Sequence, residues 1–383
     1  MQIQPIPQAS NARLLLADDQ PHILAALELL LSSYGYQTVC VSSPAAVLAA
    51  LQEQPFDAVM LDLNYTRDTT GGGEGLELLS CIRAIDETVP LVVMTAWSSV
   101  NLAVDAMRRG ASDFIQKPWD NRELLGKIRE QVERCRVLRT SQLLHEEETS
   151  EAAEIQKGMF PKDLPRIPGY AVSAVTRPFH FVGADYYNVT KVNDRQVAFC
   201  IADVAGKGVP GALLMANLQA ALSALIHENP RPLDLCSRVN STLCGVMPSN
   251  RFISLFYGVL DTTSHHFTYC NAGHNPPMLL RADGTASELT STGAILGHFR
   301  DWQFEQDDLQ LSPGDTLVMF TDGAVEARGP DGEFFGEERL AEQLRRDPSA
   351  RAESLLARVA AHCGKAFQDD ATIVVLAARS IGN

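Results

Sequence analysis

The chain has 383 residues, 45% of them hydrophobic and 21% charged, and its 47 acidic and 32 basic residues give a formal net charge of −15. At about 100–200 residues per domain, this length predicts two or three domains, and the apolar content excludes a disordered chain. The acidic balance argues against a nucleic-acid partner. The lack of an uninterrupted apolar run near the roughly eighteen residues of a membrane span argues against a membrane partner.

The eight cysteines are scattered and form no C-x-x-C pair, which argues against a structural zinc site and against a disulfide scaffold. The opening segment MQIQPIPQASNAR lacks the basic and then apolar pattern of a signal peptide. We therefore expect reduced thiols and a cytoplasmic location.

The first 120 residues alternate short β-branched runs with helical patterns. The predicted strands are 14–17, 38–41, 58–61, 91–94 and 113–116, and the predicted helices are 21–31, 44–52, 75–85 and 100–109. This alternation predicts an α/β domain over residues 12–120, with five strands in a doubly wound parallel sheet.

Residues 121–158 contain no proline and read as a helical linker. Leu125, Ile128, Val132 and Cys135 recur at the spacing of a coiled-coil seam. Two interpretations remain open. The segment forms a coiled coil that makes the protein a homodimer, or it forms an amphipathic helix packed on its own domain.

Residues 159–383 are predicted to form a second domain in which strands cluster instead of alternating strictly with helices. Predicted strands are 196–202, 252–259, 266–270, 316–320 and 372–376, and predicted helices are 212–227, 237–247 and 352–366. Strands that neighbour one another along the chain favour an α+β domain with antiparallel sheets.

Acidic and polar residues stand at the ends of four strands predicted in the first domain. They are Asp18, Asp19, Asp62, Thr95 and Lys117. Because the carboxyl ends of parallel strands meet at one edge of the sheet, we expect these side chains to lie together. Three crowded carboxylates favour a hard divalent ion such as Mg²⁺.

This constellation resembles the receiver domain of two-component response regulators, a CheY-like fold. The resemblance implies a sensor histidine kinase as partner and Asp62 as the phosphoacceptor. It implies a Mg²⁺ ion held by Asp18, Asp19, Asp62 and the Asn64 carbonyl. The receiver switch residues implied by the family are Thr95, Phe114 and Lys117, although ordinary core packing is the alternative for Phe114. The segment 64–75 is longer than the usual turn of the family, and its glycines suggest a mobile loop.

Aspartates also punctuate the second domain, in the motifs VGADYYN (182–188), IADVAGKGVPGALLMA (201–216), MFTDGAVEA (319–327) and FQDDATIVVL (367–376). An isolated Asp-Gly pair is only a hairpin signal. Buried strands that end in aspartates are costly unless a cation pairs with them. Four such motifs together favour a two-metal site, in which paired ions activate water for in-line attack on phosphorus.

These motifs, together with IQKGMFPKDLP and NAGHNPP, resemble the metal-dependent serine/threonine phosphatases of the phosphatase 2C (PPM) superfamily, in the SpoIIE/RsbU branch. The resemblance implies a sandwich of two antiparallel sheets flanked by helices, and two Mn²⁺ or Mg²⁺ ions. The implied catalytic ligands are Asp185, Asp203, Asp322 and Asp369, with the Val204 carbonyl and with Asp370 as a neighbour not separable from Asp369.

Two positions depart from the family pattern, because Ala184 and Asn188 stand where the family has glycine and a second acid. Asn188 either weakens a metal site or alters a hydrogen bond near it. His274 is either a turn residue or close to substrate, and Arg177, His180 and Lys207 are equal candidates for a contact with the substrate phosphate. His265 and His266 are expected at a hairpin, since no third metal ligand follows them.

The sequence therefore predicts a response regulator whose output hydrolyses phosphoserine or phosphothreonine on a partner protein, expected to be an anti-sigma-factor antagonist, under control of phosphorylation at Asp62. One alternative is a catalytically degenerate phosphatase fold that acts as a phosphorylation-controlled binding module. A cyclic-nucleotide synthase is a further alternative, but the chain shows no nucleotide-binding motif of the Walker or cyclase type.

Overall fold

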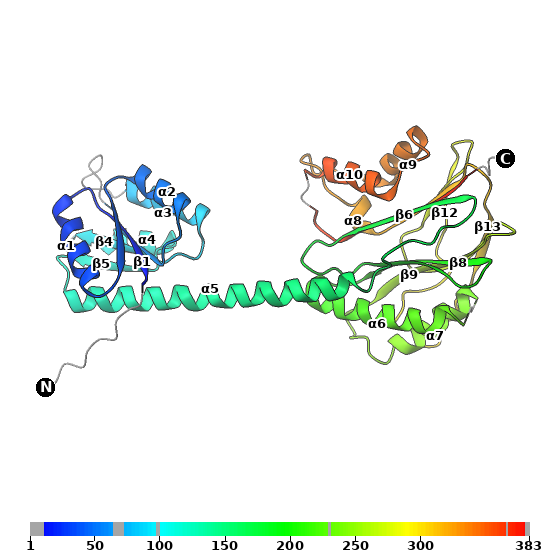
Figure 1. The fold of residues 1–383 in the computed structure, drawn as a ribbon, viewed down its shortest axis with the longest axis horizontal. Helices are drawn as coiled ribbons and strands as arrows, with labels where there is room; N and C mark the ends of the chain where they lie inside the picture. The colour runs from blue at the N-terminus through cyan, green and yellow to red at the C-terminus, as the bar shows by residue number, and fades with distance from the viewer. Residues whose placement is uncertain (1–10, 64–72, 97–99, 229–230, 365–366, 380–383) are drawn as a thin grey trace. The chain divides into compact units, whose positions relative to one another are not determined.

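The computed structural model describes residues 11–63, 73–96, 100–228, 231–364 and 367–379. The chain divides into two compact units, Met1–Glu147 and Glu148–Asn383 (Figure 1). Each unit has its own hydrophobic cores, so the two are described separately.

The first unit is an α/β domain whose five strands all pair in parallel, in the order β2-β1-β3-β4-β5. Its elements are β1 (Arg13–Ala17), α1 (Pro21–Ser33), β2 (Gln37–Val41), α2 (Pro44–Glu53), β3 (Ala58–Asp62), α3 (Gly73–Ile85), β4 (Leu91–Ala96), α4 (Val100–Arg108) and β5 (Asp113–Lys117). Proline opens α1 and α2, where its missing N–H costs nothing. The predicted doubly wound parallel sheet is confirmed.

The linker helix α5 spans Asn121–Lys157 and begins inside the first unit. The residues of the proposed seam are all buried: Leu125, Ile128, Val132 and Cys135. The first three belong to a core of the first unit, together with Leu16 and Ile115. Over these residues the structure therefore has the amphipathic helix packed on its own domain. Further along α5, the apolar side chains exposed are Val137, Leu138, Leu143, Leu144 and Ile155.

The second unit is built on two antiparallel five-stranded sheets, ordered β13-β10-β9-β8-β7 and β12-β11-β14-β15-β6. Its strands are β6 (Tyr170–Arg177), β7 (Tyr186–Lys191), β8 (Gln196–Val204), β9 (Ile253–Asp261), β10 (His266–Ala272), β11 (Met278–Leu280), β12 (Ala286–Glu288), β13 (Asp307–Gln310), β14 (Thr316–Phe320) and β15 (Ala371–Ala378). Its helices are α6 (Gly208–Ile226), α7 (Pro232–Leu243), α8 (Asp322–Val325), α9 (Gly336–Arg346) and α10 (Ala352–His362).

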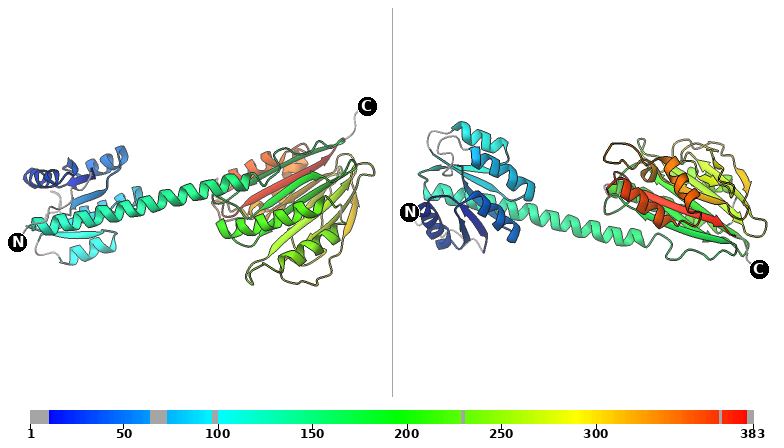
Figure 2. Two further views of the ribbon diagram at one scale, coloured as in Figure 1. Left: turned by 60° about the horizontal axis from the view of Figure 1, so that its bottom comes forward. Right: turned by 90° about the horizontal axis from the view of Figure 1, so that it is seen from above.

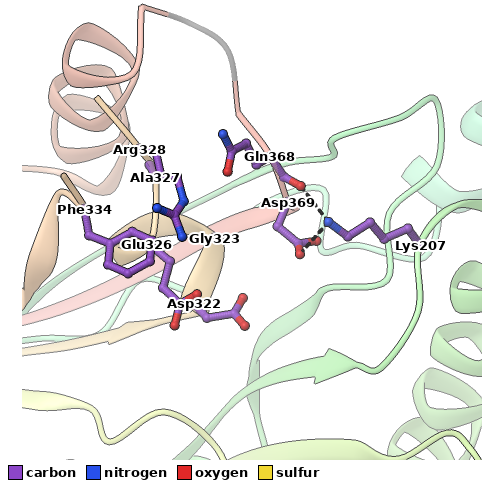
Figure 3. A pocket seen from close by; sticks show the side chains of 9 residues that line it. All are labelled: Lys207, Asp322, Gly323, Glu326, Ala327, Arg328, Phe334, Gln368 and Asp369. Carbon is purple, nitrogen blue, oxygen red and sulfur yellow. Dashed lines mark hydrogen bonds and ion pairs between the residues drawn. The ribbon is translucent and has the colours of Figure 1, made fainter. Parts of the chain in front are cut away.

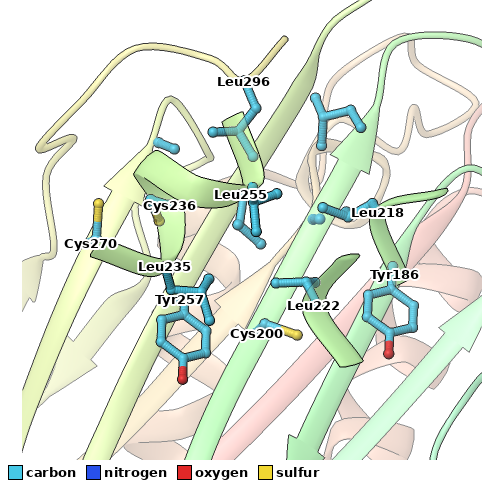
Figure 4. Close-up of a cluster of buried hydrophobic side chains, with 14 of the residues drawn as sticks. Tyr186, Cys200, Leu218, Leu222, Leu235, Cys236, Leu255, Tyr257, Cys270 and Leu296 are labelled. Carbon is cyan, nitrogen blue, oxygen red and sulfur yellow. The ribbon is translucent and has the colours of Figure 1, made fainter. Parts of the chain in front are cut away.

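Three hydrophobic cores define four layers in this unit. One core joins both sheets, with Phe199 and Phe256 facing Leu317 and Val374. A second core lies between α6, α7 and the sheet that contains β8 and β9 (Figure 4). A third lies between the other sheet and α8 to α10, which cover its outer face (Figure 2). The predicted α+β sandwich with helices outside is confirmed.

Helix α6 is long and apolar enough, by length and composition alone, to cross a membrane. A search for uninterrupted apolar runs does not find it, because Asn217 and Gln219 interrupt the run. Its residues Met215, Leu218 and Leu222 are buried in the core against β8 and β9, which is the environment of a core helix of a folded domain (Figure 4).

Several elements of the second unit escaped the sequence patterns. The short strands β12 and β13 carry mostly exposed polar residues, so they have no apolar alternation to detect. Conversely, His265 and His266 lie at the β9–β10 hairpin as expected, with His265 at a φ of 59° and its Nδ1 2.8 Å from the Tyr170 hydroxyl.

Candidate functional site

Three carboxylates gather at the carboxyl edge of the parallel sheet, where β1 and β3 end. One oxygen from each of Asp18, Asp19 and Asp62 lies within 4.8 Å of the others, and Asp18 and Asp62 are buried. Asp18 is oriented by the Gln20 N–H, which donates to its Oδ1 at 2.9 Å. The structure thus brings together residues that are more than forty positions apart in the chain.

Lys117 is the cation nearest to these carboxylates in the described part of the first unit. Its Nζ lies 2.6 Å from Asp18 Oδ2 and 3.0 Å from Asp62 Oδ2. Thr95 is buried on β4, next to β5 in the sheet, where it pairs in register with Gln116. Asn64 lies outside the described residues.

Phe114 points outward on β5 and is 42% exposed, so it is not a core residue in this conformation. The Lys127 ammonium of α5 lies 4.8 Å from the centre of its ring and donates to the Phe114 carbonyl at 2.6 Å. Sequence reasoning missed Lys127, since its partners are known only once α5 is placed beside β5.

The donor set at this edge suits a hard divalent cation, because all three side chains offer carboxylate oxygens. Asp19 Oδ1 is buried and has no hydrogen-bond partner among the described residues. An orphaned buried carboxylate oxygen beside two further carboxylates fits a Mg²⁺ ligand.

In the second unit, aspartates come from four separate segments. Asp185 lies just before β7, and Asp203 is the penultimate residue of β8. Asp322 begins α8, separated from the end of β14 by one residue, and Asp369 and Asp370 precede β15. Because the strands are antiparallel and belong to both sheets, their order in the chain did not predict that these ends meet.

Asp185 is the most buried of this group at 3% exposed. Its Oδ2 accepts hydrogen bonds from two hydroxyls, Thr321 Oγ1 and Thr372 Oγ1, each at 2.7 Å. Burial, followed by the charge of Asp203, raises the pKa of Asp185 well above its usual value, and the two hydroxyls oppose that shift. Both threonines adjoin the aspartate motifs but were not recognised as partners of Asp185.

The other carboxylates also carry the electrostatic signature of a crowded acidic site. Burial and then the charges of Asp322 and Asp369 raise the pKa of Asp203 to about 7. Burial and then Asp369 raise the pKa of Asp322. Buried carboxylates whose pKa is raised by neighbouring carboxylates favour a bound cation, and an oxygen-only donor set fits Mg²⁺ or Mn²⁺.

Asp369 and Asp370, which are indistinguishable by sequence, have different environments. Both oxygens of Asp370 accept backbone N–H groups, from Phe179 at 2.7 Å and from Ala184 at 2.6 Å. Asp369 is half-buried, and its Oδ2 lies 2.8 Å from Lys207 Nζ. The carboxylate of Asp370 is therefore engaged with the loop before β7, whereas that of Asp369 faces a pocket.

That pocket has a volume of about 170 Å³ and contains both acids and bases (Figure 3). Its lining comprises Lys207, Asp322, Gly323, Glu326, Ala327, Arg328, Phe334, Gln368 and Asp369. Lys207 Nζ also donates to the Gln368 carbonyl at 2.6 Å and lies 5.2 Å from the ring centre of Phe179. Of the three residues considered for phosphate contact, Lys207 lines this pocket. Arg177 lies over the ring of Phe367, and the ring of His180 is tilted against that of Phe179.

The turn between β8 and α6 brings backbone close to the aspartates. Gly206 has a φ of 139°, and a Cβ there would lie 1.7 Å from Arg251 Nη1, which donates to the Ala205 carbonyl at 2.8 Å. Only glycine fits this conformation and this close approach. The turn ends at Lys207, the N-cap residue of α6, so its geometry determines where the ammonium group lies.

The structure places both departures from the expected pattern, and it gives a packing partner for Ala184. Ala184 is buried, and it packs against α6 at Gly211, where an added Cβ would lie 2.8 Å from that of Ala184. Asn188 lies within β7 in register with Cys200. His274 is buried with Nδ1 2.8 Å from the Ser254 hydroxyl, and burial lowers its pKa to about 4, so it has the environment of a structural residue.

Comparison with known proteins agrees with both units. Residues 14–129 match the family described as response regulator receiver domain, and residues 193–379 match the family described as stage II sporulation protein E (SpoIIE). Protein IcfG of Synechocystis is 31% identical over 236 residues, which cover 54% of this chain and 37% of IcfG. Phosphoserine phosphatase RsbU of Bacillus subtilis is 29% identical over 230 residues, which cover 59% of this chain and 68% of RsbU.

Among solved structures, the SiaA-PP2C domain of Pseudomonas aeruginosa superposes with a TM-score of 0.54 at 23% identity, covering 61% of this chain and 97% of that domain. This likeness supports the fold of the second unit. The chain spans little more than a third of IcfG, so the two proteins share part of their architecture only. The matches along the chain thus show that it joins a receiver domain of the response-regulator family to a phosphatase domain of the SpoIIE family.

Proposed function

We propose that the protein is a metal-dependent phosphoprotein phosphatase that hydrolyses phosphoserine or phosphothreonine. The observation that carries this proposal is that Asp322 and Asp369 line one pocket with Lys207 and that the charges of both carboxylates raise the pKa of Asp203. The likeness to RsbU, a phosphoserine phosphatase, supports the same reaction.

Each residue of the site has a role in the proposed reaction. Asp185, Asp203, Asp322, Asp369 and the Val204 carbonyl would hold two Mn²⁺ or Mg²⁺ ions. Such ions, when bound, activate water and neutralise charge on the phosphoryl group. Thr321 and Thr372 orient Asp185, and Asp370 holds the loop that carries it. The Lys207 ammonium lies where it can bind a phosphoryl oxygen of the substrate.

We further propose that the receiver domain controls this output. Asp62 would accept a phosphoryl group from a sensor histidine kinase, with Mg²⁺ held by Asp18, Asp19, Asp62 and Asn64. Lys117 and Thr95 would bind the transferred group, and Phe114 would change its position on phosphorylation. The three carboxylate oxygens within 4.8 Å and the orphaned Asp19 Oδ1 support this assignment.

The proposed partners follow from the two domains. On the family resemblance, the substrate would be a phosphorylated anti-sigma-factor antagonist in the cytoplasm. The domain boundaries proposed are 12–120, 121–158 and 159–383.

Dimerisation would use the exposed part of α5, where Val137 and Leu144 are separated by one heptad. A change of Leu144→Glu should then give a monomer by light scattering, and a wild-type protein that is already monomeric would refute the dimer.

Hydrolysis of an aryl phosphate by the full-length protein, measured with and without Mn²⁺, tests the phosphatase proposal. We expect Mn²⁺-dependent turnover that Asp203→Ala abolishes. Turnover no higher than that of the variant would instead favour a degenerate fold that binds its partner without catalysis.

Control by the receiver needs a separate measurement. The phosphatase rate should change when beryllofluoride, a phosphate mimic, is added to the wild type and should not respond in Asp62→Asn. Equal rates in all of these conditions would reject control through Asp62.

A further inference from the structure

The last turn of α5 contains a reversal of the usual helix pattern. Gln156 is buried at 8% exposed, while its apolar neighbour Ile155 is 61% exposed. Burying an amide while exposing an isoleucine is unfavourable unless the amide gains specific hydrogen bonds. The structure supplies two such bonds.

Both ends of the Gln156 amide bind the backbone of one residue, Gly183. Its Oε1 accepts the Gly183 N–H at 2.9 Å, and its Nε2 donates to the Gly183 carbonyl at 2.7 Å. This pairing satisfies both backbone polar groups of Gly183, two residues before Asp185. It therefore fixes the position of the loop before β7 relative to the last turn of α5.

The segment just after α5 contacts the two residues that follow Asp185. The ring of Phe160 lies 5.7 Å from that of Tyr186 and 5.3 Å from that of Tyr187, measured between centroids. Asp185 is thus placed between two anchors that both belong to residues 156–160. On the site side, Asp370 holds the same loop through the N–H groups of Phe179 and Ala184.

We propose that Gln156 is a positioning residue for the metal site: it sets the position of Asp185 through Gly183, so that the last turn of α5 governs metal affinity. This inference rests on the proposed function and deepens it by naming how the site is regulated. Because α5 is a continuous helix from Asn121 to Lys157, a shift or rotation of its last turn moves Gln156 and with it the Asp185 loop.

Mn²⁺ affinity of the full-length protein, measured by isothermal titration calorimetry, tests the proposal without relying on catalysis. Gln156→Met keeps the size of the side chain and removes both hydrogen bonds. Loss of groups that orient a metal ligand typically weakens binding by about tenfold to a hundredfold, and we expect a loss in that range. Gln142→Met makes the same change at an exposed site of the same helix and should bind Mn²⁺ like the wild type.

A second readout separates positioning from a merely structural role. If Gln156 positions Asp185, excess Mn²⁺ should restore most of the turnover of an aryl phosphate by Gln156→Met, because the fault lies in metal affinity. If Gln156→Met does not fold, Gln156→Asn decides, since its shorter amide cannot reach both groups of Gly183 and should show the same loss. Wild-type Mn²⁺ affinity in a folded Gln156 variant, even one of lower thermal stability, would overturn the proposal.

The two proposals can fail separately. Mn²⁺ binding that depends on Gln156, in a protein that hydrolyses no phosphate ester, would refute the phosphatase function and leave the positioning role standing. If the wild type hydrolyses the ester with Mn²⁺, but the Gln156 variants bind Mn²⁺ as tightly as the wild type, the positioning role would be refuted and the phosphatase function would stand. A wild-type protein that binds no Mn²⁺ would refute both.

Discussion

The hydroxyl pair that holds Asp185 can be tested by removing one hydroxyl at a time. Thr321→Val conserves volume at a fully buried site but deletes the 2.7 Å bond to Asp185 and the acceptor of the Thr372 N–H at 3.0 Å. A lost hydrogen bond to a carboxyl group costs about 1–3 kcal/mol and an unsatisfied buried N–H a similar amount, so we expect a loss of about 2–6 kcal/mol in unfolding free energy.

Thr372→Val should cost less. It loses its bond to Asp185 and one to the Thr176 hydroxyl at 2.8 Å, but Thr176 is only half-buried and can bind water instead. The expected loss is about 1–3 kcal/mol. Thr190→Val, on the partly exposed face of β7, serves as a control and should change stability by less than about 0.5 kcal/mol.

Urea denaturation in the presence of a chelator measures these stabilities, and a Mn²⁺ titration of each variant measures the metal site. Because each hydroxyl bond lowers the pKa of Asp185, its loss raises that pKa further and disfavours the carboxylate that a metal needs. Both variants should therefore bind Mn²⁺ more weakly than the wild type. A larger loss of unfolding free energy in Thr372→Val than in Thr321→Val would refute this assignment of the two hydroxyls. Wild-type affinity for Mn²⁺ in both variants would refute it as well.

Three further outcomes are expected. Since the pKa of Asp203 is raised to about 7, its contribution to the stability of the metal-free protein is full below about pH 4 and is lost as the pH rises through 7. With a chelator present, Asp203→Asn should therefore have a higher melting temperature than the wild type at pH 8 but not at pH 4. The exposed control Asp194→Asn should match the wild type at both pH values. A melting temperature of Asp203→Asn below that of the wild type at pH 8 would contradict this. Lys117→Met should destabilise the receiver domain, because two buried aspartates lose their cation. Added Mg²⁺ should then raise the melting temperature of this variant more than that of the wild type. An equal rise in both proteins would contradict this prediction. Arg139→Ala should lower receiver stability in urea by about 1 kcal/mol, since the guanidinium bonds the Phe56 carbonyl at 2.9 Å, and no change would show that this contact is not stabilising.

The sequence was most informative about the first domain, because the topology of a parallel sheet relates the order of strands along the chain to the positions of their ends in space. In the first unit, strand–helix alternation implies a parallel sheet, and a parallel sheet places every strand's carboxyl end at one edge. Asp18, Asp62 and Lys117 could therefore be placed together before any coordinates were available, and the structure has them within ion-pair distance. In the second unit, antiparallel strands end at both edges of two sheets, so chain order does not place Asp185, Asp203 and Asp322 together. That expectation came from the recurrence of the aspartate motifs and from the family resemblance.

Tertiary packing decided what the patterns left open. The seam at Leu125, Ile128 and Val132 has the same spacing whether its partner is a second chain or the domain's own sheet, and the core of the first unit shows the sheet as its partner. Asp369 and Asp370 differ because the backbone N–H groups that occupy Asp370 belong to a loop almost two hundred residues earlier.

By itself, the amino-acid sequence determined the two folds and the acidic motifs, because hydrophobic periodicity and strand-end aspartates are local properties. Only the tertiary structure identified Gln156, Thr321 and Thr372 as partners of the Asp185 loop. The physical reason is that a buried hydrogen bond depends on where two distant backbone segments meet, and no local pattern of residue types records that meeting.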